Sequence, residues 1–219
     1  MSKNLGPIHY MMYEKIKFQD KITDFLMDGK TEEIDKNYKP VETRDLDDLI
    51  DQDNIHGWLS SRIDVVENRL AQAMALARNT KEKMYELGKL EGDSERLTSL
   101  EEVFDKLNLR LLDGMPCDRG LSAGLDEDGN LLLVTNDNLH AKYQKSRVNP
   151  EDSLDNTCDG NHSHDHHESF ELGKVREDEI KGEASTYHAL RYEFIRGFLE
   201  NSPYEVDLVN GINYKIKER

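Results

Sequence analysis

Apolar side chains recur at helical spacing in several segments of this chain, and this periodicity is what most limits its fold. Segments 7–29, 53–88 and 94–114 each place an apolar residue every three or four positions. A fourth such segment, 184–201, lies near the C-terminus. A helix with one apolar face needs that face covered, so the four segments are expected to pack against one another.

Strand signals are confined to short stretches between and after these segments. Asn210-Gly211 supplies the positive φ angles of a tight hairpin turn between 204–209 and 212–216. Residues 126–130 indicate a turn, and 131–135 a short strand after it. The fold class that we predict is therefore mainly α, a four-helix up-and-down bundle with a small C-terminal β-hairpin element.

The periodicity stops between the third and fourth predicted helices. Residues 149–178 combine many acids with a cluster of histidines and have no regular apolar spacing, which is typical of a disordered insertion. We therefore predict one domain. Residues 1–148 contribute three helices and the short strand, 149–178 form the insertion, and 179–219 add the fourth helix and the hairpin. Residues 30–52 are expected to be a surface connection with a short helical turn at 46–50.

The overall charge bears on the partners. The chain has 45 acidic and 29 basic residues and a formal net charge of −16, so nucleic acid is not an expected partner. A membrane is not expected either, because no run of 18 apolar residues occurs. Two cysteines in unlike surroundings suggest free thiols and a cytoplasmic location.

Several side chains that bind metals lie on or beside the predicted helices. A helical wheel of 53–88 puts His56 and Glu67 on one line, but about 16 Å apart, so a metal there would need ligands from other helices. The full set of candidate core ligands is His9, His56, Glu67, Cys117 and His140. Such a set would hold zinc or iron. The competing interpretation is that the histidines are ordinary half-buried residues.

The insertion holds a second candidate metal site of a looser kind. Its donor side chains are Cys158, His162, His164, His166 and His167, all within one short stretch. Imidazole-rich clusters bind zinc, nickel or copper. Because the stretch must become ordered on binding, its affinity is expected to be modest.

Arginines on the helices suggest an alternative site without a metal. Arg191 lies near the centre of an otherwise apolar helix face, and Arg62 and Arg69 border the apolar face of 53–88. Each could be paired internally, with Glu67, Glu183 or Glu193 as the carboxylate. Alternatively, Arg191 could form the fork of a pocket between helices that binds a small anion.

Two function classes follow. The first is a transition-metal-binding helical bundle whose activity the sequence does not name, with zinc, iron or nickel as the metal. The second is a non-catalytic module that binds a protein partner, a second copy of the chain or a small anion. Motifs for nucleotide binding and for the common hydrolases are absent from the sequence. Whether the chain is an enzyme stays open.

Overall fold

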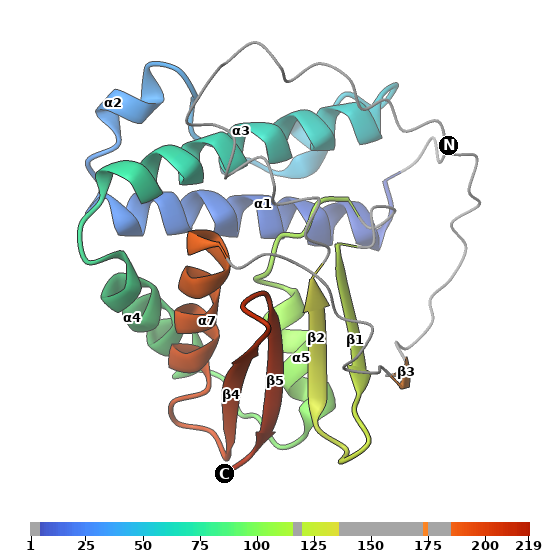
Figure 1. Cartoon of the computed structure of the whole chain (residues 1–219). Coiled ribbons are helices and arrows are strands. Elements are labelled where there is room, and N and C mark those ends of the chain that lie inside the picture. Colours follow the sequence, from blue (N-terminus) through green and yellow to red (C-terminus); the bar gives the residue numbers. More distant parts are fainter. Residues whose placement is uncertain (1–4, 116–119, 136–172, 175–184) are drawn as a thin grey trace.

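The longest two helices lie side by side. The computed structural model describes residues 5–115, 120–135, 173–174 and 185–219. Helices α1 (Pro7–Leu26) and α3 (Ile55–Leu76) run next to each other across one side of the molecule (Figure 1). His9 and Tyr13 of α1 meet His56 and Trp58 at the start of α3. The two helices are therefore parallel.

This orientation corrects the up-and-down bundle predicted from the sequence. Consecutive helices of such a bundle are antiparallel, with short loops. Here residues 27–54 return along the whole length of α1 before α3 begins, through the short helix α2 (Glu32–Asp35) and the 3-10 turn η1 (Leu46–Asp48). The helical turn expected at 46–50 is confirmed. The connection was expected to lie on the surface, but three of its side chains are buried: Ile34, Leu46 and Ile50.

The second predicted helix is in fact two helices. α3 ends at Leu76. After three intervening residues α4 (Thr80–Gly92) begins and runs in another direction (Figure 1). Ala77 is extended, and Asn79 has a φ of 53°, a left-handed conformation that ends helical hydrogen bonding. Asparagine tolerates that conformation better than most residues other than glycine.

Helices α4 and α7 (Thr186–Phe198) pack with their backbones in contact. A Cβ added to Gly88 would lie 2.0 Å from the carbonyl oxygen of Phe194, and one added to Gly197 would lie 2.0 Å from that of Tyr85. Only glycine leaves room for so close an approach. The remaining helix, α5 (Leu100–Asn108), is capped by the Ser99 hydroxyl, which accepts the N–H of Glu102.

The strands form one sheet. β1 (Leu121–Leu125) and β2 (Leu131–Thr135) are an antiparallel pair, and β4 (Tyr204–Val209) and β5 (Asn213–Glu218) are another. β2 pairs with β5, and the two-residue β3 (Gly173–Lys174) pairs with β1, which gives the order β3-β1-β2-β5-β4.

The predicted C-terminal hairpin is confirmed, with positive φ at Asn210 and Gly211 and a loop that also includes Ile212. The hairpin continues the β1–β2 pair into one sheet. β3 lies inside the predicted insertion 149–178, and the other residues of that insertion lie outside the described part of the chain.

The buried apolar residues form two clusters. The larger one joins α4, α5, α7 and the sheet to the C-terminal halves of α1 and α3. The smaller one lies between the N-terminal halves of α1 and α3 and includes Leu112 and Met115. Within the described ranges no helix has the length and apolar character needed to cross a bilayer.

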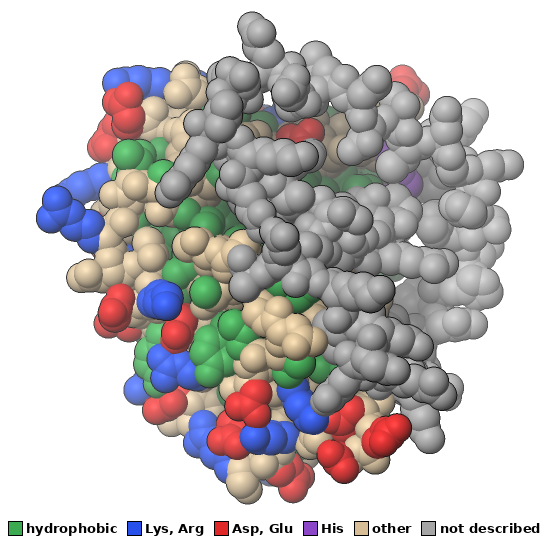
Figure 2. All heavy atoms as spheres, viewed as in Figure 1, with side chains coloured by type: hydrophobic (Ala, Val, Ile, Leu, Met, Phe, Trp, Pro, Cys, Tyr) green, Lys and Arg blue, Asp and Glu red, His purple; other side chains and the backbone are tan. Residues whose placement is uncertain are grey.

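On the face drawn in Figure 2, acidic and basic side chains are mixed at the bottom of the view, where β4 begins and β5 ends (Figure 1). Lys217 of β5, for example, pairs with Asp207 of β4 at 2.6 Å.

Gly197→Ala tests the backbone contact between α4 and α7. Helix propensity alone would favour alanine by about 1 kcal/mol. The clash with the Tyr85 carbonyl should instead lower the free energy of unfolding by about 1 to 3 kcal/mol. Urea unfolding followed by circular dichroism measures the difference. A variant as stable as the wild type would show that the two helices have room to spare.

Candidate functional site

A buried ion pair joins α7 to the segment that follows α5. Arg191 on α7 is 3% exposed, and its two terminal nitrogens donate to the two carboxylate oxygens of Asp113 at 2.5 and 2.7 Å. The sequence analysis placed Arg191 at the centre of an apolar helix face, and its burial there is confirmed. Its partner is Asp113 and not Glu67 or Glu193, and Glu183 lies outside the described residues.

Two buried tyrosines surround this pair. The Arg191 guanidinium lies 5.6 Å from the ring centroid of Tyr214 on β5. Tyr187 lies one turn before Arg191 on α7. Burial raises the pKa of both phenols well above the usual value, so both stay protonated at neutral pH. Burial opposes the charge of Arg191, but Asp113 outweighs it and raises the pKa of the guanidinium.

Lys15 of α1 is the second buried cation of this region. It is 7% exposed, and its Nζ donates to Asn108 Oδ1 at 2.8 Å. Burial lowers the pKa of Lys15 to about 8, an effect that Asp113 opposes and Arg191 reinforces. Strongly shifted pKa values of this kind are common at functional sites.

A small cavity adjoins the ion pair. It has a volume of about 20 Å³, enough for a guest the size of a water molecule. Gln19, Tyr187 and Arg191 are polar residues that line it. The apolar part of the wall consists mainly of Ile22, Leu70, Met74, Met84, Leu190 and Phe194. Within the described part of the chain, Arg191 Nε has no hydrogen-bond partner.

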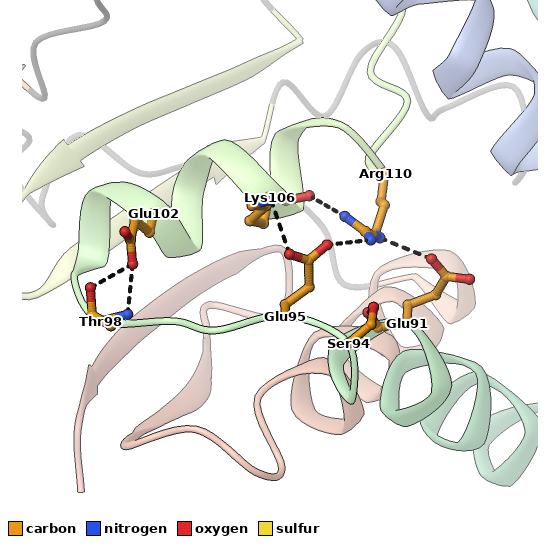
Figure 3. A network of polar contacts seen from close by, with 7 residues as sticks. All are labelled: Glu91, Ser94, Glu95, Thr98, Glu102, Lys106 and Arg110. Atoms are coloured by element: carbon orange, nitrogen blue, oxygen red, sulfur yellow. Dashed lines mark hydrogen bonds and ion pairs between the residues drawn. The ribbon is translucent and has the colours of Figure 1, made fainter.

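Arg110 also lines the cavity, but its guanidinium is held by surface carboxylates (Figure 3). Its Nε donates to Glu91 at 3.0 Å, and a terminal nitrogen donates to Glu95 at 2.8 Å. Glu95 also pairs with Lys106 at 3.0 Å. This network fixes the α4–α5 connection. Among the described residues that line the cavity, Arg191 is therefore the one with a buried N–H donor, Nε, that has no hydrogen-bond partner.

The other two arginines predicted as anion ligands have different surroundings. Arg69 is fully buried on α3, with Asp20 and Asp35 both at 2.5 Å and Asp24 at 3.5 Å. Carboxylates of the chain thus occupy the positions that an external anion would take. Arg62 lies 5.6 Å from the ring centroid of Trp58 and does not line the cavity. Neither residue joins Arg191 in one site.

Of the candidate core metal ligands, the structure brings two together. The ring centroids of His9 and His56 lie 5.8 Å apart, in an edge-to-face arrangement. His9 is buried, and its Nδ1 accepts the Gly6 N–H at 2.9 Å. Glu67, also buried, lies three turns along α3 from His56, near Tyr187 instead.

The remaining candidate ligands cannot be placed. Cys117 and His140 lie outside the described residues, as do all five donors of the insertion: Cys158, His162, His164, His166 and His167. Within the ranges that the structure covers, no three His, Cys, Asp or Glu side chains are grouped closely enough to hold a metal ion.

Lys15 and Asp113 were missed by the sequence analysis. Lys15 carried a usable signal, because Met11, Met12, Phe18 and Ile22 lie three, four or seven positions from it, so it faces the same way as they do. The same reasoning had found Arg191. Asp113 carried none, since it lay near the end of the predicted helical segment 94–114, whereas α5 ends at Asn108.

Comparison with known proteins gives no further guidance: no protein-family model, no curated protein and no solved structure matches this chain.

Arg191→Ala tests the buried ion pair. It would leave the Asp113 carboxylate buried without its strongest partner, so the free energy of unfolding should fall by about 3 kcal/mol. Arg196→Ala is the matched control on the same helix. It breaks a partly exposed pair with Glu193 and should cost less than about 1 kcal/mol. Thermal and urea unfolding measure both, and equal losses in the two variants would contradict the assignment.

Proposed function

We propose that this chain is a ligand-binding module that takes a small amphipathic molecule into the cavity beside Arg191. The observation that carries the proposal is a buried guanidinium whose Nε has no partner among the described residues, in the wall of a mainly apolar cavity. Apolar cavities with a few convergent polar groups and shifted pKa values are the usual form of small-molecule sites. The proposal develops the small-anion alternative drawn from the sequence. Asp113 takes both terminal nitrogens of Arg191, so the ligand binds to Nε in their place.

The cavity limits the size of the ligand. A volume of about 20 Å³ holds a guest the size of a water molecule, so the ligand is short and Met74 and Met84 move to admit it. Methionine side chains are unbranched and adapt readily to new neighbours. A ligand of four heavy atoms at about −1.5 kcal/mol per atom could not bind more tightly than about 40 µM, so millimolar constants are expected.

Titration with short amphipathic molecules tests this function. The probes are acetamide, acetate, propanol and propionate, and the readout is the NMR signal of ¹³C-labelled methionine methyl groups. Met74 and Met84 should shift and saturate, because they line the cavity. Met12, buried in the other apolar cluster, is the internal control and should stay unchanged. If no probe moves Met74 or Met84, or if Met12 moves equally, the cavity does not bind such ligands.

Metal binding is the second candidate function, and the proximity of His9 and His56 favours it. Two imidazoles on one tetrahedral zinc have ring centroids about 5 Å apart, close to the 5.8 Å found here. The Gly6 hydrogen bond counts against it. A neutral imidazole that accepts at Nδ1 carries its proton on Nε2, so His9 would have to give up that bond to bind a metal.

Metal analysis of the untagged protein tests this second function. If His9 and His56 bind tightly with ligands outside the described residues, one equivalent of metal should survive dialysis, and His56→Ala should release it. Deleting 156–169 should remove only weak, superstoichiometric zinc or nickel binding. Tight metal retained by His56→Ala, or absent from the wild type purified without chelators, would rule out the helical site.

A further inference from the structure

One of the two buried cations beside the cavity has no ion pair among the described residues. Lys15 and Arg191 are both cationic, and Asp113 is the carboxylate that influences both. Arg191 occupies both Asp113 oxygens, at 2.5 and 2.7 Å. Within the described residues Lys15 forms no ion pair, and its hydrogen bond goes to the neutral side chain of Asn108. Burying an ammonium group without an anionic partner is unfavourable, so Lys15 can accept a negatively charged partner.

Other charged and titratable groups nearby do not fill this role. Glu67 is buried, but it acts on Tyr187 and has no resolved influence on Lys15. Tyr187 and Tyr214 stay protonated, because burial raises the pKa of each phenol. Among the described residues, Lys15 is therefore a buried cation without an ion pair.

The Lys15 side chain lies next to the cavity wall. Gln19 follows Lys15 by one turn of α1, on the same face, and lines the cavity. Leu112 lines it too and directly precedes Asp113. On the α7 side, Arg191 belongs to both the wall and the charged group. Met74, Met84 and Phe194 make another part of the wall apolar.

From this arrangement we infer that the ligand of the cavity is a short monocarboxylate, whose charge is balanced by the Lys15 ammonium and whose carboxylate accepts the free N–H of Arg191. This inference rests on the proposed ligand-binding function and adds the chemical class of the ligand. The methyl end of the acid occupies the apolar wall. The small volume favours the shortest acids, which enter when Met74 and Met84 move aside.

Acetate and acetamide are the decisive pair of probes, because they have nearly the same shape and differ in charge. Near neutral pH the wild type should bind acetate at least about tenfold more tightly than acetamide, as expected for hydrogen bonds to charged groups. Titrations monitored at Met74 and Met84 measure both constants. If neither probe binds, the proposed function fails. If both bind equally, the function holds and the inference about charge is wrong.

Lys15→Met separates a ligand-binding role from a structural one. The substitution keeps the apolar stem and removes the buried charge, so the melting temperature should be unchanged or higher. The tenfold preference for acetate should disappear, with acetamide binding retained. Lys17→Met is the matched control, because Lys17 lies on the more exposed side of α1 and pairs with Glu14. It should keep the preference. A preference that survives Lys15→Met overturns the inference.

The pH dependence gives a test that needs no variant. Acetate stays ionised across the neutral and mildly basic range, whereas Lys15 has a pKa of about 8. A bound anion favours the ammonium form and raises that pKa, so binding takes up protons near pH 8. Acetate affinity should be constant below this pKa and fall above it, while acetamide affinity stays level. Parallel profiles for the two probes would exclude Lys15 as the charge partner.

Discussion

The Arg191–Asp113 pair is the contact at which the separate layers of this protein meet. It links α7 to the segment after α5, and the guanidinium lies over Tyr214 of β5. Lys15 brings α1 to the same place through Asn108. Compared with apolar residues of equal volume, a buried pair adds little stability, since desolvation offsets the attraction. What it does impose is a strong penalty on any arrangement in which one partner is buried without the other.

A second buried arginine fixes the course of the chain between the first two long helices. Arg69 of α3 binds Asp20 of α1, Asp35 of α2 and the backbone carbonyl of Tyr38. The Asp20 carboxylate also accepts the backbone N–H of Val41. These bonds hold the return segment against both helices. The parallel orientation of α1 and α3 thus depends on the Arg69 side chain. Three carboxylates and one backbone carbonyl surround its guanidinium.

The sequence predicted well the features that depend on local spacing. The period of the apolar residues located α1 and α7 to within three residues and α5 to within six, and Asn210-Gly211 located the hairpin. The break at Ala77 was not predictable, because residues 77–80 contain neither proline nor glycine. β1 was missed because Leu-Ser-Ala-Gly-Leu has a weak strand propensity.

Features that depend on distant residues were predicted less well. The direction of α3 relative to α1 is set by contacts such as Arg69 with Asp35, which no local pattern reveals. The candidate site was found in part. The wheel position of Arg191 identified it as buried, and the same argument applied to Lys15 would have found the second cation. Asp113 and the cavity emerge only when α1, α3, α4 and α7 are brought together.

The parallel arrangement of α1 and α3 has an electrostatic consequence. Their N-termini lie at the same end, so the positive ends of two helix dipoles add there instead of cancelling. The chain approaching this end is acidic, with Glu42, Asp45, Asp47, Asp48, Asp51 and Asp53 in twelve residues. Asp47 accepts a hydrogen bond from Tyr10 in the first turn of α1. Negative charge in this connection thus favours the parallel topology over its antiparallel alternative, which would separate the two positive ends.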